Sequence, residues 1–260
     1  MAHPAYGVLR PVTPFASVLL DENPGMMTLD GTNSWLLRAP GSAGCVLVDP
    51  GYLHEEHLNR LAAHGPVELV LLTHRHPDHA ESAESFAERV GAAVRAFDAQ
   101  RCVGAQALTD DEVVDAAGLR LRVLHTPGHT DDSICLRVAV GAAESEAVLT
   151  GDTILGRGTT VISALGPYLD SLRRLAELPA GTVGLPGHGP ELADMAGTVL
   201  EYREHRERRL DQVRMAVREL GEQASVLEVV ERVYVDVDPS LLAPAESSVR
   251  AQLEYLREHG

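Results

Sequence analysis

The chain has 260 residues and a formal net charge of −16, and all 22 of its basic residues are arginines. Nearly half of the residues are apolar, which is enough for a substantial core, but no run of about 18 apolar residues occurs, so we expect no membrane-spanning helix. The acidic balance disfavours nonspecific binding to nucleic acid. Three cysteines and an N-terminus without a basic and apolar leader predict a cytoplasmic protein with reduced thiols.

Between residues 18 and 190, short apolar runs alternate with helical patterns. We expect strands at Ser34–Arg38, Cys45–Asp49, Val67–Leu72, Ala93–Ala96, Leu119–Leu124, Ser133–Val140, Ala147–Leu149 and Thr182–Leu185. We expect helices at Glu55–His64, Asp78–Val90 and Leu169–Glu177. His54, His57 and His64 fall on the first of these helices, which is expected at the surface, and they receive no role.

Beyond Gly189 the sequence becomes helical. Glu191–Leu220 is dense in Arg, Glu and Leu, and Ser225 is suited to cap a helix that reaches Val235. Asp238-Pro239 is expected to break this helix, and Glu246–His259 to form the last one. We therefore predict two domains, residues 1–190 and residues 191–260.

The most informative stretch is Thr-His-Arg-His-Pro-Asp-His at residues 73–79, directly after the apolar run Val67–Leu72. Three imidazoles and a carboxylate thus gather at the end of a strand. Neutral imidazole and carboxylate are good ligands for zinc and related metals. The four residues can serve two adjacent ions, with His74 and His76 facing one and Asp78 and His79 facing the other. The alternative is a polar surface loop that happens to be rich in histidine, since the chain has 12 histidines.

Further ligand candidates stand at the ends of later strands. His129 lies in Thr-Pro-Gly-His-Thr, Asp152 in Thr-Gly-Asp-Thr and His188 in Pro-Gly-His-Gly-Pro, and each follows a short apolar run. Each motif alone is a weak signal, because a histidine in a Gly/Pro turn is more often an ordinary surface residue. Together they repeat one arrangement, in which a strand delivers a ligand at its C-terminal end.

The ordered motifs THRHPDH, PGHT, GDT and PGHGP resemble the metallo-β-lactamase fold superfamily. The resemblance implies an α/β fold, a four-layer αββα sandwich with the metals at the edge between the two sheets. It also implies two zinc ions, with manganese or iron as alternatives. In that family arrangement the first ion is held by His74, His76 and His129, the second by Asp78, His79 and His188, and Asp152 bridges them.

A finer resemblance is to the lactamase-beta-2-like group, which includes a single-strand-specific endoribonuclease. It rests on residues 23–37, 126–133, 151–160 and 168–172. Position 152 is an aspartate, whereas class B β-lactamases generally have a cysteine there. In this respect the chain is similar to glyoxalase II and ribonuclease Z. β-Lactam hydrolysis is then expected only as a weak side activity. The C-terminal helices resemble a winged-helix-like domain, truncated because the chain ends at Gly260 before a wing.

We therefore expect a dinuclear zinc hydrolase with a metal-bridging hydroxide, which Asp78 orients or deprotonates. Its substrate is a single-stranded RNA phosphodiester or a small ester or thioester. A glyoxalase-II-like thioesterase is the main alternative, and a di-iron redox protein or a non-catalytic scaffold are alternatives of another class. The general acid and the choice between monomer and homodimer stay open.

Residues outside the ligand set receive weaker assignments. Asn33, Thr159 and Thr160 are expected to contact substrate. Tyr168 is assigned either a substrate contact or a packing role. Asp49, at a strand end, is expected to orient a ligating imidazole, and Asp30 is a second candidate for that role.

Overall fold

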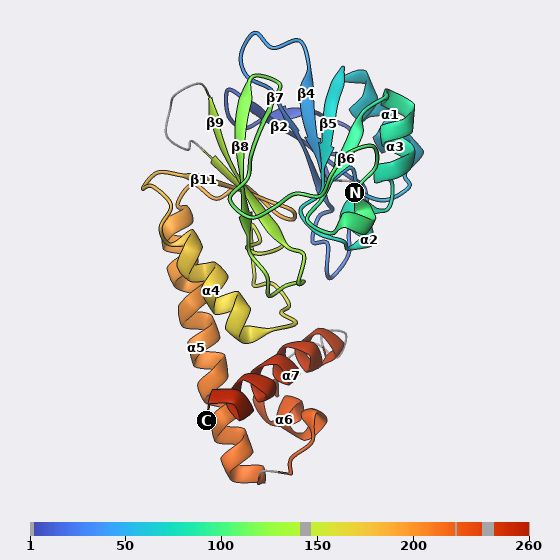
Figure 1. The fold of residues 1–260 in the computed structure, drawn as a ribbon. Coiled ribbons are helices and arrows are strands. Elements are labelled where there is room, and N and C mark those ends of the chain that lie inside the picture. The colour runs from blue at the N-terminus through green and yellow to red at the C-terminus, as the bar shows by residue number, and fades with distance from the viewer. Residues whose placement is uncertain (1–2, 141–146, 222, 236–241, 260) are drawn as a thin grey trace.

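Two β-sheets pack face to face, and helices cover the outer face of each sheet (Figure 1). The computed structural model describes residues 3–140, 147–221, 223–235 and 242–259. Strand order is β1-β2-β3-β4-β5-β6 in the first sheet and β11-β10-β9-β8-β7 in the second. The four-layer αββα sandwich predicted from the motifs is confirmed.

The first sheet is antiparallel from β1 to β4 and parallel from β4 to β6. Its strands are β1 (Arg10–Pro11), β2 (Ala16–Leu20), β3 (Asn33–Leu37), β4 (Cys45–Val48), β5 (Val67–Leu71) and β6 (Ala93–Arg95). Its covering helices are α1 (Glu55–Ala63), α2 (Pro77–Ala80) and α3 (Ala83–Val90), and the 3-10 turn Ala99–Arg101 follows β6. Leu58, Leu61 and Phe86 from the helices are fully buried against this sheet.

The second sheet is antiparallel except for its β10–β11 pair. Its strands are β7 (Val113–Ala116), β8 (Leu119–His125), β9 (Ile134–Val140), β10 (Ala147–Gly151) and β11 (Val183–Pro186). Helix α4 (Leu165–Leu175) covers its outer face. The core between the sheets contains Trp35, Leu37, Leu121 and Leu136, all at most 2% exposed.

Among the described residues beyond β11, the structure has the helices α5 (Met195–Leu220), α6 (Val226–Val233) and α7 (Leu242–His259). Met195, Val199 and Tyr202 near the start of α5 pack into the same cluster as α4. Further along, Val213 joins Val229, Val230, Val249 and Leu253 in a separate small core. Helix α5 therefore extends from the sandwich into the C-terminal helical unit (Figure 1).

Several element boundaries differ from the sequence predictions. The predicted helix Asp78–Val90 is two helices, α2 and α3, and between them the hydroxyl of Ser82 donates to the carbonyl of Gly51 (2.9 Å). Helices α4 and α7 each begin four residues earlier than predicted, at Leu165 and Leu242. Strands β1, β2 and β7 were not predicted. Asp238-Pro239 lies outside the described residues.

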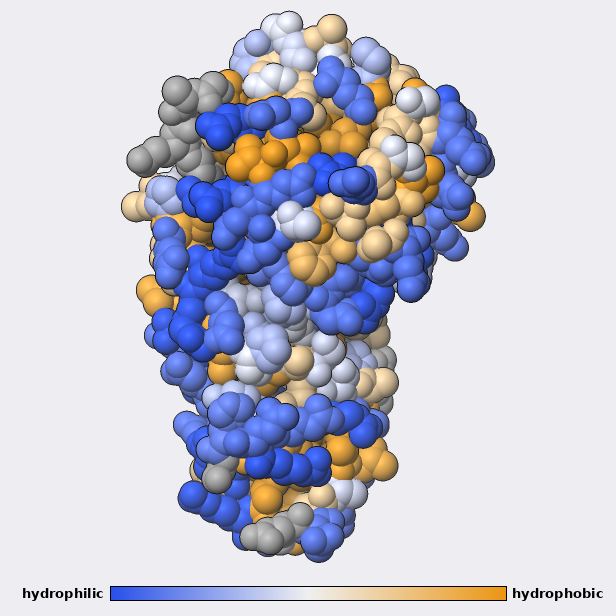
Figure 2. Space-filling view, viewed as in Figure 1, coloured by the Kyte–Doolittle hydropathy of each residue, from blue (hydrophilic) through white to orange (hydrophobic). Residues whose placement is uncertain are grey.

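Ser225 caps α6 as predicted: its hydroxyl accepts from the backbone of Glu228, and the Glu228 carboxylate accepts from the backbone of Ser225. On the face shown in Figure 2, hydrophilic residues predominate, and hydrophobic residues gather over the sandwich and near the lower end of the C-terminal helices. None of the described helices combines the length and the apolar character needed to cross a bilayer.

Candidate metal centre

Seven side chains from both sheets meet at one edge of the sandwich. The segment after β5 supplies His74, His76, Asp78 and His79, the last two from the short helix α2. The second sheet supplies the other three, one after each of the strands β8, β10 and β11: His129, Asp152 and His188. All seven positions chosen from the sequence are therefore brought together, in three overlapping groups whose ligand atoms lie within 4.8 Å of one another.

The first group consists of His74, His76 and His129. Nδ1 of His76 lies 3.0 Å from Nε2 of His74 and 2.9 Å from Nε2 of His129. The opposite nitrogens of the outer rings are engaged, since Nδ1 of His74 is 3.0 Å from the Thr73 hydroxyl and Nδ1 of His129 is 2.8 Å from the Val161 carbonyl. If the rings are neutral, the Nε2 atoms of His74 and His129 each carry a lone pair and can only accept a hydrogen bond. A single proton on Nδ1 of His76 cannot serve both of these acceptors. A cation satisfies all three.

The second group consists of Asp78, His79 and His188. Nε2 of His188 lies 3.1 Å from Oδ2 of Asp78 and 3.2 Å from Nε2 of His79. The other nitrogen of His188 donates to the Gly31 carbonyl (3.0 Å), so its Nε2 is directed at the group. His79 is held in the same way, because its Nδ1 is 2.8 Å from the Asp49 carboxylate.

Asp152 stands between the two groups. Its Oδ2 lies 3.7 Å from Nε2 of His129 and 3.5 Å from Nε2 of His188, and its Oδ1 lies 3.4 Å from Nε2 of His79. Oδ1 is buried and makes no hydrogen bond within the described residues. A buried carboxylate oxygen without a donor is costly in a protein interior. A metal ion on each side of Asp152 would remove that cost, so the donor set fits a pair of divalent cations.

Burial and neighbouring charges shift the pKa values of the histidines in the two groups in opposite directions. Burial lowers the pKa of His74 well below its usual value and that of His76 to about 4, which favours neutral rings at these two residues. Burial would also lower the pKa of His79 and His188, but the Asp152 carboxylate outweighs it and raises the pKa of His79 well above its usual value and that of His188 to about 9. Metal binding to the second group must therefore displace protons.

Asp49 directly supports the ligands. Its carboxylate accepts from the backbone N–H of Thr73 (2.8 Å), the hydroxyl of Thr73 (2.7 Å) and the ring of His79. Through the Thr73 hydroxyl the same network reaches Nδ1 of His74. Asp30 does not do this: it pairs with Arg157, with N···O 2.8 Å, at the rim of the site.

The structure shows where the residues that were expected to contact substrate lie. Thr159 is exposed, and Thr160 is buried with its hydroxyl 3.1 Å from Nδ1 of His129, so Thr160 supports a ligand. Asn33 is 5% exposed, and its amide donates to the Pro186 and Gly189 carbonyls beside His188. Tyr168 is fully buried and its hydroxyl donates to the Thr153 carbonyl (2.7 Å), so the packing role describes it and a substrate contact does not.

Sequence reasoning overlooked a buried polar network behind the second group. His57 is 2% exposed rather than on a helix surface, and its Nε2 is 2.9 Å from the Ser34 hydroxyl, which donates to the Asp49 carbonyl. Asp21 is fully buried beside it, with Oδ1 2.6 Å from Nδ1 of His54. His54 directly precedes α1, and His57 and Leu58 follow it three and four positions later, so the three share one side of the helix. Because Leu58 is buried, this spacing could have suggested a histidine that faces inward.

Known proteins resemble this chain over both of its parts. A profile described as the metallo-β-lactamase superfamily matches residues 27–188, and a β-lactamase-associated winged helix domain matches residues 225–260. An atrochrysone carboxyl ACP thioesterase from Aspergillus chevalieri is 32% identical over 95% of this chain and 80% of its own length. A β-lactamase-like protein 2 homolog from Caenorhabditis elegans is 30% identical over 93% of this chain and 84% of its own.

The architecture also recurs in solved structures. The crystal structure of a β-lactamase domain protein from Burkholderia ambifaria has a TM-score of 0.82 at 24% identity, covering 99% of this chain and 90% of that one. That identity supports the fold alone. Against some fungal lactamase-like proteins the chain spans less than two thirds of their length, 62% and 65% in two cases.

Proposed function

Because the chain belongs to the metallo-β-lactamase superfamily of hydrolases, we propose that it is a two-zinc enzyme that hydrolyses acyl thioesters and related small esters. The observation that carries the hydrolase assignment is the convergence of six ligand side chains around Asp152, whose buried Oδ1 lacks a donor. Such an arrangement suits a pair of cations, and a complete ligand set argues against a non-catalytic scaffold.

Zinc is the metal that this donor set suits best. Five imidazoles and two carboxylates, with no thiolate, are common ligands for catalytic zinc. Manganese and iron accept the same donors, so a di-iron redox role is the alternative that metal identity would reveal. Two zinc ions would supply Lewis acidity, lowering the pKa of water at the centre and polarising the scissile carbonyl.

The protein side chains contribute positioning and proton transfer. The ring nitrogens that do not face the centre are held by carbonyl, hydroxyl or carboxylate acceptors, which fixes the orientation of His74, His79, His129 and His188. Asp78 is only partly buried, so its carboxylate can meet both a ligand and solvent. We assign Asp78 the orientation of the attacking water and the acceptance of its proton.

The thioester assignment rests on the comparison and on charge. The relative that is similar over 95% of this chain is named as a thioesterase. A net charge of −16 without a single lysine opposes binding to an RNA backbone, which relies on many cationic contacts. A hydroxyacylglutathione thioester belongs to the same substrate class and is the alternative within it. The cysteines are unpaired, which supports our proposal of a cytoplasmic enzyme.

The decisive experiment joins metal analysis to a substrate panel. Protein purified without added metal would be analysed for zinc, manganese and iron. It would then be assayed with an acetyl thioester, S-lactoylglutathione, a phosphodiester, single-stranded RNA and a β-lactam. We expect two zinc ions per chain and thioester cleavage that chelation removes, with at most weak β-lactam cleavage.

His74→Ala should lose both activity and metal, whereas His64→Ala, a change at an exposed histidine, should retain both. Cleavage of RNA and not of thioesters would reject the substrate class. Bound iron with every substrate untouched would reject the hydrolase in favour of a redox protein.

A further inference from the structure

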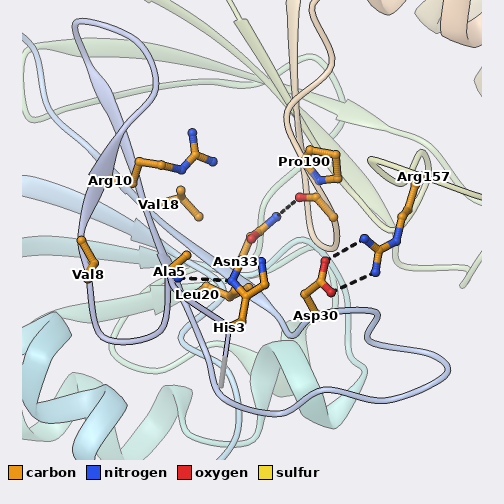
Figure 3. A pocket seen from close by; sticks show the side chains of 11 residues that line it. His3, Ala5, Val8, Arg10, Val18, Leu20, Asp30, Asn33, Arg157 and Pro190 are labelled. Carbon is orange, nitrogen blue, oxygen red and sulfur yellow. Dashed lines mark hydrogen bonds and ion pairs between the residues drawn. The ribbon is translucent and has the colours of Figure 1, made fainter. Parts of the chain in front are cut away.

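A cavity of about 280 Å³ opens between the N-terminal segment, β2 and the loops that follow β10 and β11 (Figure 3). Val8, Val18, Leu20 and Pro190 supply the apolar part of its lining, and the polar part comes from His3, Arg10, Asp30, Asn33 and Arg157. The side chains of Val18 and Leu20 come from β2 and are themselves buried, so this part of the wall is rigid. None of the seven candidate ligands lines the cavity, so it is a space separate from the metal centre.

The cavity nevertheless shares walls with the second metal group. Its lining residues Gly189 and Pro190 directly follow His188. Asn33, which also lines it, donates to the Gly189 carbonyl (2.8 Å), and the preceding Thr32 forms a β-bridge with His188. The backbone of residues 188–190 therefore connects a candidate ligand to a wall of the cavity, and Thr32 and Asn33 hold that backbone in place.

The charges at the cavity rim are already neutralised. Arg157 pairs with Asp30 (2.8 Å) and Arg10 pairs with Glu191 (2.7 Å), each guanidinium facing a carboxylate. Figure 3 shows the Arg157–Asp30 pair on one side of the cavity and Arg10 on the other. A phosphate or a carboxylate would have to displace one of these partners. An apolar group meets no such competition and gains from leaving water.

We propose that this cavity binds the apolar part of the acyl group whose thioester carbonyl lies at the metal centre. The proposal rests on the function proposed above and deepens it by naming the acyl class. An apolar cavity of about 150 Å³ holds one benzene ring, so about 280 Å³ accommodates roughly two fused rings or about eight carbons. The enzyme is therefore selective for bicyclic aromatic or medium-chain acyl groups over acetyl.

The test fills the cavity from its rim. Val8 is 55% exposed, so Val8→Trp places an indole in the cavity without disturbing the core, and Val113→Trp is the matched control at a 40% exposed valine of the distant strand β7. Metal-loaded protein would be assayed with acetyl, octanoyl and 2-naphthoyl thioesters of N-acetylcysteamine. Binding of 2-naphthol to metal-free protein would be measured separately by calorimetry.

We expect Val8→Trp to raise KM for the octanoyl and naphthoyl thioesters and to weaken 2-naphthol binding by about tenfold, with the acetyl thioester and Val113→Trp unaffected. Equal acyl preference in wild type and Val8→Trp would overturn the acyl pocket while leaving the thioesterase intact. If no thioester is hydrolysed but only Val8→Trp loses 2-naphthol, the apolar site stands and the proposed function falls. Naphthol binding unchanged by Val8→Trp would reject the site regardless of activity.

Discussion

Asp49 is held in a backbone conformation that few residue types adopt, with φ at +56°. In that position its carboxylate is 99% shielded from solvent and accepts from Thr73 twice and from His79 once. Aspartate and asparagine are the non-glycine residues that tolerate positive φ best. Position 49 therefore needs a residue that tolerates positive φ and that also carries a negative charge. A single substitution can remove the charge and keep the backbone conformation.

Asp49→Asn should keep the backbone and damage the second metal group. An amide facing Nδ1 of His79 sets donor against donor, which favours a proton on Nε2 where a metal must bind. We expect the affinity for the second ion to fall about 10- to 100-fold, with a smaller effect on the first. Metal content after dialysis against buffered zinc measures this, with Asp30→Asn at the exposed rim as the control. Two ions retained as tightly as in the wild type would refute the role of Asp49.

The buried imidazole of His57 should make the stability of the folded chain depend on pH. Burial lowers its pKa to about 4, against about 6.5 in an unfolded chain. The folded state then binds fewer protons below pH 6.5, so the contribution of His57 to stability is present above that pH and is lost as pH falls toward 4. His57→Gln keeps a donor for Ser34 and removes the titration.

The expected difference is measurable by urea unfolding of metal-free protein. On going from pH 7 to pH 5, the wild type should lose on the order of 2 kcal/mol more unfolding free energy than His57→Gln, because only the wild type must keep this imidazole neutral. The exposed-site variant His64→Gln should follow the wild type. Parallel pH profiles for wild type and His57→Gln would show that the ring is not held neutral by the fold.

At the scale of elements, helix α5 contacts the metal centre indirectly through Arg206. This guanidinium is 3% exposed, donates to the Thr160 carbonyl and lies 5.2 Å from the centre of the Tyr168 ring. Within the described residues no carboxylate pairs with it, and its Nε is unpartnered. Thr160 and Val161 in turn hold Nδ1 of His129. A C-terminal helix thus stabilises the loop that orients a ligand of the first metal.

Arg206→Met should therefore act on catalysis rather than on substrate binding. The methionine keeps most of the apolar stem but leaves the Thr160 carbonyl without its donor. We expect kcat to fall by up to about tenfold with KM nearly unchanged, together with weaker zinc binding at the three-histidine group. Arg209→Met is the matched control, because Arg209 lies in the same helix but stacks on Tyr234 at the end of α6 (4.3 Å to the ring centre), away from the metal centre. Equal effects of both substitutions would assign Arg206 a purely structural role.

The ligand positions could be read from the sequence because each depends on local structure: a strand, a turn and a side chain at its C-terminal end. What could not be read depends on contacts distant in sequence. His57 is buried because α1 packs its inner face near Asp21, 36 positions away. Arg206 stands among arginines and glutamates in the sequence, and nothing in that local pattern indicates that its side chain is buried. Strands β1 and β2 were missed because their pairing, not their composition, defines them.

At the scale of the whole molecule, the metal centre joins the two sheets and α5 joins the sandwich to the C-terminal helices. The candidate ligands come from both sheets, so two bound ions would connect elements that already meet through the core and through the hydrogen bonds of Asn33 to the Pro186 and Gly189 carbonyls. Each ion at a concentration 100-fold above its Kd adds about 2.7 kcal/mol of stability. Helix α5 is continuous over 26 residues and has side chains in both cores.

Metal removal should therefore lower the stability of the entire chain in one step. We expect a single calorimetric transition whose midpoint falls by roughly 10–20 °C on chelation, because about 5 kcal/mol from two ions is lost from a unit of this size. Asp152→Ala removes the carboxylate that stands between the two groups, so chelation should change the midpoint of this variant little. Two separate transitions, of which only one responds to chelator, would show that α5 does not couple the helical unit to the sandwich. In that case the effect of Arg206 on His129 would be confined to the first turns of α5.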